Sequence, residues 1–218
     1  LMTTSLNAAL GESLKRWRIL PVVKVDDVAQ GLAVAQACLR GGLSAIEITL
    51  RTPAALDAIA AVASRLPSMA IGAGSVLEAG QMAAAKRAGA AFAVSPGSLP
   101  ELFEAADSLA MPWLPGAATA SEILYARRAG YRVLKFFPAA TAGGIAALRQ
   151  LAGPFTDVRF CPTGGIGADS VAHYLALPNV VCVGGSWIAD ETAIEQGLWD
   201  QIASRAAAAL STLPPPPR

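Results

Sequence analysis

Histidine and cysteine are scarce in this sequence of 218 residues, which contains one histidine and three cysteines. Zinc-dependent enzymes usually recruit several histidines, so the single His173 disfavours metal catalysis, and we expect no metal or other cofactor. His173 lies in a helical pattern and is interpreted as a surface or packing residue. Cys38, Cys161 and Cys182 are odd in number, far apart and set among apolar residues. That arrangement predicts buried thiols in a reducing compartment.

An excess of either charge and a long apolar run are also missing. Seventeen basic and sixteen acidic residues give a formal charge of +1, so neither a nucleic acid nor an anionic membrane is an expected partner. The longest charge-free stretch, 170–189, is interrupted by Pro178 and by the Gly184-Gly185 pair, which predicts helix, turn and strand instead of a membrane span. The first residues lack the order of a secretory signal, so we expect a cytoplasmic protein.

Several sequence motifs of catalysis are absent. The chain has no nucleophile elbow, no P-loop and no CxxC pair. The segment IGAGS (71–75) has GxG without a third glycine, which is poor evidence for a dinucleotide site. Close backbone packing explains these glycines equally well.

What is present is a regular alternation of short apolar runs with Ala- and Leu-rich stretches at helical spacing. The predicted strands are 19–25, 44–50, 70–76, 91–96, 112–116, 133–138, 158–163 and 180–186. The predicted helices are 27–40, 53–65, 78–88, 99–106, 119–129, 143–151, 168–176 and 191–210, with start signals at Asp26, at Pro53, and at Thr119 with Glu122 as a capping box.

Eight such units predict an α/β protein with a single (β/α)8 TIM barrel, and the alternative is a doubly wound open sheet. We expect one domain, 1–212, with an N-terminal helical extension. The proline run in 213–218 predicts a disordered tail, and its alternative is a ligand for a proline-binding module.

Lys135 interrupts the apolar run VLKFFP. Because side chains alternate along a strand, Leu134 and Phe136 are expected to face the helices, while Lys135 and Phe137 face the barrel interior. A buried ammonium costs free energy unless it is paired or neutral, and a neutral amine can attack a carbonyl. The sequence therefore predicts either a nucleophilic lysine or an internal ion pair.

A second inward-facing charge occurs in EITLR, where Glu47, Thr49 and Arg51 share one side of a strand. Glu47 can act as a general acid and base, and Arg51, at the strand's carboxyl end, can bind a carboxylate with two hydrogen bonds. The alternative is an internal salt bridge between Glu47 and Arg51 or Lys135.

Glycine pairs follow the seventh predicted strand and occur in the eighth, in CPTGGIG (161–167) and VGGSW (183–187). Barrels commonly bind phosphate there through backbone amides and a following helix N-terminus. We predict a phosphate site at Gly164, Gly165, Gly185 and Ser186, with ordinary tight turns as the alternative.

Taken together, these motifs resemble the family of 2-keto-3-deoxy-6-phosphogluconate (KDPG) and 4-hydroxy-2-oxoglutarate (KHG) aldolases. The resemblance extends from about Ile19 to Trp199. It is carried by EITLRT (47–52), IGAGSV (71–76), SPG (95–97), KFFPA (135–139), GPF (153–155), VRFCPTGGI (158–166) and GGSW (184–187).

The resemblance implies reversible cleavage of a phosphorylated keto acid to pyruvate and glyceraldehyde 3-phosphate, in a homotrimer. Lys135 matches the Schiff-base lysine, Glu47 the proton-transfer residue and Arg51 the pyruvate-carboxylate ligand. Ser75 replaces a threonine of the family's GAGT, which keeps a hydroxyl for that carboxylate. Other matches are the pocket-lining Pro96, Phe137 and Thr163 and the phosphate-binding Gly164, Gly165, Gly185 and Ser186.

Three alternatives stay open at this point. One is the aldolase for the phosphogalactonate epimer, which shares the lysine but resembles this chain less around EITLRT and CPTGG. The second is an isomerase or synthase in which Lys135 supplies only a charge or a proton. The third is a catalytically silent phosphate-binding barrel. Cleavage of KHG to pyruvate and glyoxylate is a further activity that the resemblance implies.

Overall fold

The computed structural model describes residues 2–213, with side chains from residue 5 onward. Its strands are β1 (Ile19–Val23), β2 (Ala45–Thr49), β3 (Ala70–Gly74), β4 (Phe92–Val94), β5 (Trp113–Leu114), β6 (Gly116–Ala117), β7 (Val133–Phe136), β8 (Arg159–Pro162) and β9 (Val183–Gly185). Its helices are α1 (Met2–Trp17), α2 (Val28–Arg40), α3 (Ala55–Arg65), α4 (Ala79–Arg87), α5 (Pro100–Leu109), α6 (Ala120–Arg128), α7 (Gly144–Ala152), α8 (Val171–Leu175), α9 (Glu191–Glu195) and α10 (Trp199–Ser211).

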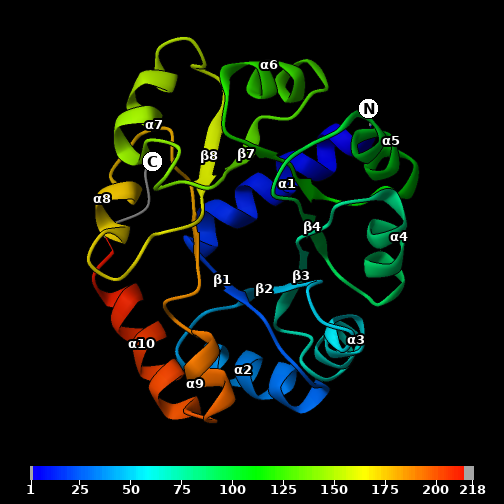
Figure 1. Ribbon diagram of the computed structural model, residues 1–218, viewed down its shortest axis with the longest axis vertical. Coiled ribbons are helices and arrows are strands. Elements are labelled where there is room, and N and C mark those ends of the chain that lie inside the picture. Colours follow the sequence, from blue (N-terminus) through cyan, green and yellow to red (C-terminus); the bar gives the residue numbers. More distant parts are fainter. Residues whose placement is uncertain (1, 214–218) are drawn as a thin grey trace.

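The strands surround the centre of the molecule and the helices lie outside them (Figure 1). All strand pairs are parallel, but they form two separate sheets. One is a curled half-barrel in the order β5-β4-β3-β2-β1-β9, and the other is the small sheet β6-β7-β8. The prediction of a closed eight-stranded (β/α)8 TIM barrel is therefore wrong, although the α/β class is correct.

Two prolines explain the breaks between the sheets, because proline has no N–H with which to continue a strand ladder. Pro115 divides the single predicted strand 112–116 into β5 and β6. On β8, the amide of Phe160 donates to Asn179 on the β9 side, and Pro162, two residues on, has no amide to donate. Only two isolated bridges join this region to the chain around β9, Phe160↔Val180 and Thr163↔Gly184.

Alternation along the strands separates two apolar clusters. The larger cluster lies between the strands and the outer helices and includes Leu134 and Phe136, as the sequence predicted. The smaller cluster fills the interior with strand residues such as Leu20 and Phe92, and Leu10 and Leu14 of α1 complete it. Helix α1 thus crosses one end of the strand arrangement and buries its apolar face there (Figure 1).

The predicted helix boundaries are only partly correct. Thr119 accepts from the Glu122 amide and the Glu122 carboxylate accepts from the Thr119 amide, which confirms the capping box of α6. The cap of α2 is Asp27 instead of Asp26. The predicted helix 191–210 is interrupted between α9 and α10, where Gly197 adopts a φ of 66° that favours glycine.

Two predictions made from composition, on the cysteines and on membrane spans, can be compared with the structure. Cys38, Cys161 and Cys182 are free and buried, as predicted. Among residues 2–213, no helix combines the length and apolarity that crossing a membrane requires. Of the predicted proline-rich tail, residues 214–218 lie outside the described residues, and Leu213 packs partly against the larger cluster.

Candidate active site

Lys135 of β7 and Glu47 of β2 form an ion pair in the interior of the strand arrangement. The Lys135 Nζ donates to Glu47 Oε1 at 3.2 Å. Both residues are almost completely buried, with exposed fractions of 5% and 1%. Burying two ions costs more free energy than burying an apolar pair of the same volume. Stability alone therefore does not explain why this ion pair is present.

The groups around this pair come from β3 and from the end of β7. Gly74 of β3 pairs with Thr49 and packs against Glu47; a Cβ at residue 74 would lie 2.6 Å from Glu47 Cγ. The Lys135 Nζ lies 5.4 Å from the centre of the Phe137 ring. Glu47 Oε2 is buried and has no hydrogen-bond partner among the described residues. One oxygen of this carboxylate is therefore not engaged by any described group.

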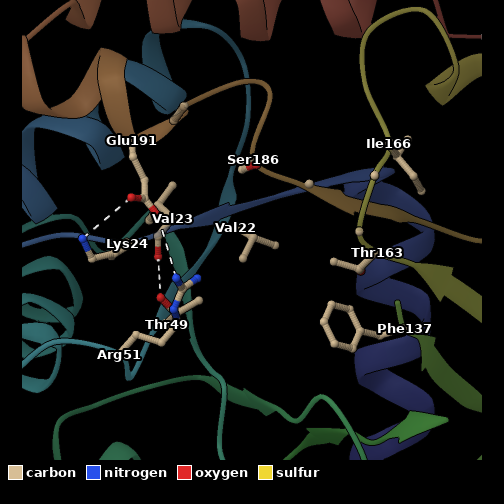
Figure 2. A pocket seen from close by; sticks show the side chains of 14 residues that line it. Val22, Val23, Lys24, Thr49, Arg51, Phe137, Thr163, Ile166, Ser186 and Glu191 are labelled. Carbon is tan, nitrogen blue, oxygen red and sulfur yellow. Dashed lines mark hydrogen bonds and ion pairs between the residues drawn. The ribbon is translucent and has the colours of Figure 1, made fainter. Parts of the chain in front are cut away.

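A cavity of about 210 Å³ opens at the carboxyl ends of the strands. Figure 2 shows Phe137 and Thr163 on one side of it, Arg51 and Thr49 on the opposite side, and Ser186 at its edge. The same cavity is lined by Gly164, Gly165 and Gly185. Seven of the predicted site residues therefore meet around one cavity, although they come from distant parts of the chain: Arg51, Phe137, Thr163, Gly164, Gly165, Gly185 and Ser186.

Four predicted site residues are not among those lining the cavity. Glu47 and Lys135 each precede a cavity-lining residue, Thr49 or Phe137, by two positions, so they lie on the same strand face beneath the cavity. Ser75 directly follows Gly74 and has a φ of 57°, a conformation that costs a residue with a Cβ free energy and is concentrated at functional sites. Pro96 follows β4, and its backbone packs against Gly116 of β6.

The glycine turns have a structural requirement as well as a place in the cavity. Gly164 and Gly165 have φ values of 103° and 71°, which residues with a side chain rarely adopt. A Cβ on Gly165 would lie 2.6 Å from that of Ala140. The N-terminus of α8 does not line the cavity, because α8 begins only at Val171, whereas the first residue of α9, Glu191, does line it.

Sequence reasoning missed two charged residues of the cavity, Lys24 and Glu191. Glu191 Oε1 lies 3.8 Å from Arg51 Nη2, and its Oε2 lies 3.8 Å from Lys24 Nζ. Dashed lines in Figure 2 mark these ion pairs. Lys24 also lies 3.5 Å from Asp26. Alternation from Leu20 and Val22 to Lys24 was a sequence signal for the lysine, whereas nothing in the local pattern indicated Glu191.

Glu191 is the first residue of α9, and its neighbour Asp190 fixes the start of that helix. The Asp190 carboxylate accepts from the Ala193 amide at 2.8 Å and pairs with Arg205 of α10. These contacts, the Ala193 amide first, lower the pKa of Asp190. The helix that carries Glu191 is therefore held at the edge of the cavity at neutral pH.

An α/β fold, a buried lysine–glutamate pair and a cavity with an arginine fit the class of carbon–carbon lyases that work through a lysine amine. The family model described as "Aldolase: KDPG and KHG aldolase" matches residues 10–205. The chain belongs to this family.

Individual relatives agree with the family. A 2-dehydro-3-deoxy-phosphogluconate aldolase of Pseudomonas aeruginosa is 50% identical over 185 residues, which are 85% of this chain and 84% of that protein. A crystal structure of KDPG aldolase from Legionella pneumophila, with pyruvate captured at low pH as a covalent carbinolamine intermediate, has a TM-score of 0.89 and 42% identity, covering 91% of this chain and 97% of that one. The Zymomonas mobilis ZM4 enzyme with 3-phosphoglycerate has a TM-score of 0.84 and 39% identity, with coverages of 91% and 94%.

Proposed function

We propose that this chain is a class I aldolase that cleaves KDPG to pyruvate and glyceraldehyde 3-phosphate through a Schiff base on Lys135. The observation that carries the proposal is the buried pair of Lys135 and Glu47 beneath the cavity. Its family membership and the carbinolamine captured in the Legionella relative support the same chemistry.

The first half of the reaction takes place on the amine. Lys135 transfers a proton to Glu47, 3.2 Å away, and the neutral Nζ then attacks the keto carbon of the substrate to give a carbinolamine. Glu47 returns this proton to the carbinolamine hydroxyl, which leaves as water, so the step produces an iminium and restores the Glu47 carboxylate. The positive iminium at C2 accepts the electron pair of the C3–C4 bond, which lowers the barrier to cleavage of that bond.

The second half needs a group that removes and returns a proton. Glu47, directly or through one water, takes the proton of the C4 hydroxyl as the bond between C3 and C4 breaks, and the aldehyde product is released. The remaining enamine of pyruvate is protonated, and water then hydrolyses the iminium to free pyruvate and Lys135. The unpartnered Glu47 Oε2 supports this role.

The two anionic ends of the substrate find different partners in the cavity. Arg51 binds the carboxylate of the pyruvate half, and the Ser75 hydroxyl assists it from the end of β3. The glycine turns with Ser186 bind the phosphate. Pro96, Phe137 and Thr163 confine the carbon chain between these ends.

KHG is a second proposed substrate, because the family that the chain matches is described as both KDPG and KHG aldolase. Its cleavage gives pyruvate and glyoxylate through the same Lys135 iminium. The pyruvate half of the two substrates is identical, so Lys135, Glu47 and Arg51 serve both reactions.

We also propose that residues 1–212 form one domain, that the protein is a cytoplasmic homotrimer and that neither nucleic acid nor membrane is its partner. The large apolar cluster, which includes residues from β1 to α10, supports one domain. Leu124 and Tyr125 of α6 are exposed apolar side chains that support contact between subunits. Multi-angle light scattering tests the oligomer: a monomer at micromolar concentration would contradict it.

Trapping with borohydride tests the proposed chemistry. Pyruvate and borohydride are expected to leave a reduced adduct on Lys135, located by peptide mass spectrometry and distinguished from the other three lysines. Lys135→Met should give no adduct at that peptide and no pyruvate release from KDPG in a coupled assay. Folded wild-type protein without an adduct, or equal pyruvate release by both proteins, would contradict the proposal.

A further inference from the structure

Arg51 and Lys24, the two cations that line the cavity, share one anionic partner within the protein. Glu191 lies between Arg51 and Lys24, with each of its two carboxylate oxygens 3.8 Å from one of the cations. We propose that Glu191 is a resident counter-ion of this cavity: it competes with the carboxylate of the substrate for Arg51 and thereby sets the affinity for anionic ligands. This inference rests on the proposed function, because it takes Arg51 as the carboxylate ligand.

The distances are typical of a partner that can be replaced. A charge-assisted hydrogen bond between a guanidinium and a carboxylate is about 2.7–2.9 Å long. Glu191 is farther than that from both cations. The side chains of Arg51 and Glu191 are more than half exposed, so water and ions screen their attraction. A substrate carboxylate that binds Arg51 with two direct hydrogen bonds therefore forms the stronger contact.

Lys24 determines how strongly Glu191 competes. It is less exposed than Arg51 or Glu191, and its Nζ lies 3.8 Å from Glu191 Oε2 and 3.5 Å from Asp26, a carboxylate that does not line the cavity. Lys24 thus shares the carboxylate with Arg51 and partly neutralises it. Without Lys24, the full negative charge of Glu191 would act on Arg51 and on any incoming anion.

The anchoring of α9 keeps Glu191 in this position. Asp190 accepts from the Ala193 amide and pairs with Arg205, which fixes the residue immediately before Glu191. Figure 2 shows Glu191 reaching from this helix toward Lys24 and Arg51 at the edge of the cavity. Glu191 is therefore a specificity-determining residue, whereas Lys135 and Glu47 beneath the cavity perform the chemistry.

The test measures binding of two probes by isothermal titration calorimetry in low salt. Pyruvate carries a carbonyl and can react with Lys135, whereas lactate has a similar carboxylate but no carbonyl. Glu191→Gln should lower the Kd for both by about threefold, the range expected for one exposed ion pair. The matched control is Glu195→Gln, which removes the same charge from an exposed position of α9 that does not line the cavity and should leave both Kd values unchanged.

Variants of Lys24 provide a second binding test. Lys24→Met should raise the Kd for lactate, and the Lys24→Met/Glu191→Gln double variant should return it toward the wild-type value. The effect of Glu191→Gln should shrink when the salt concentration is raised to about 0.5 M, because added ions screen exposed charges. In turnover assays, Glu191→Gln should lower KM and leave kcat unchanged, which a purely structural role of Glu191 would not produce.

The outcomes separate this inference from the proposed function. A lower lactate Kd in Glu191→Gln supports the inference, and if borohydride then traps no pyruvate adduct, only the proposed function is contradicted. An unchanged or higher lactate Kd in Glu191→Gln overturns the inference even when pyruvate is trapped. The same conclusion follows if Glu195→Gln has an equal effect, or if lactate binds to none of the proteins.

Discussion

At the level of single residues, the proposed chemistry depends on two opposite charges held together away from water. Lys135 and Glu47 are 3.2 Å apart and almost completely buried. Removing one partner would leave the other charge buried and unpaired, which costs several kcal/mol. Variants that preserve shape and hydrogen bonding are therefore the informative ones.

Glu47→Gln keeps the shape of the side chain but cannot accept and return a proton. We expect kcat for KDPG cleavage to fall by about 100-fold, a typical value for loss of a general acid–base group. Borohydride trapping of pyruvate should persist, because Lys135 remains. Steady-state kinetics and mass spectrometry measure the two effects. Undiminished kcat would remove Glu47 from the mechanism.

Gly74→Ala tests the space that the glutamate occupies. The added methyl would overlap the Glu47 side chain, so the carboxylate must move away from Lys135. Misplacement by about 1 Å can cost about 100-fold in rate, and we expect a loss of kcat of that order. Gly80→Ala on α4 is the matched control, since its methyl meets nothing within 4 Å. Equal kcat in both variants would contradict this role of Gly74.

At the level of elements, local signals decide where helices begin but not how strands pair. Thr119 and Glu122 were recognised as a capping box from their spacing, and both hydrogen bonds form. The fifth strand was predicted as one element, yet Pro115 divides it. A capping box requires only residues three positions apart, whereas a ladder depends on donors and acceptors from distant strands.

Thr119→Ala removes the side-chain acceptor at the start of α6. We expect the free energy of unfolding to fall by about 1 kcal/mol and the Tm by about 2–4 °C. Because α6 residues do not line the cavity, kcat should not change. Chemical denaturation and thermal melting give these values, with the exposed Thr156→Ala as control. A loss below 0.3 kcal/mol would show that the cap contributes little.

At the level of the whole molecule, α1 joins the interior to the rest of the fold. Leu14 is fully buried and packs with interior residues of the strands, including Leu20 and Phe92. Helix α1 precedes the first strand but has contacts with β1, β5 and β7, which belong to both sheets. The helix therefore contributes to holding the half-barrel and the small sheet together.

Leu14→Ala should lower the free energy of unfolding by about 2–5 kcal/mol, because it removes buried methyl groups and leaves a cavity. If residues 1–212 form one domain, calorimetry should show a single transition at a lower Tm. Leu77→Ala, whose side chain is 59% exposed, should change the Tm little. Two separate transitions would contradict the single domain.

The sequence by itself determined which side chains point inward along a strand. Alternation is a property of the local backbone, so Lys135 and Glu47 could be assigned to the interior without knowledge of their neighbours. Arg51 was expected on the same face, but it follows the end of β2 and is more than half exposed at the cavity. The glycine turns and the family resemblance were recognised from sequence motifs. Alternation failed for Glu191, which follows no periodic strand pattern.

Only the tertiary structure decided how these segments meet. The placement of Glu191 between Arg51 and Lys24 depends on where α9 packs relative to β1 and β2. Likewise, separation of the strands into a six-stranded half-barrel and a three-stranded sheet depends on which amides face a neighbouring strand at Pro115 and Pro162. Both outcomes follow from contacts between residues far apart in the chain, and local propensity does not encode such contacts.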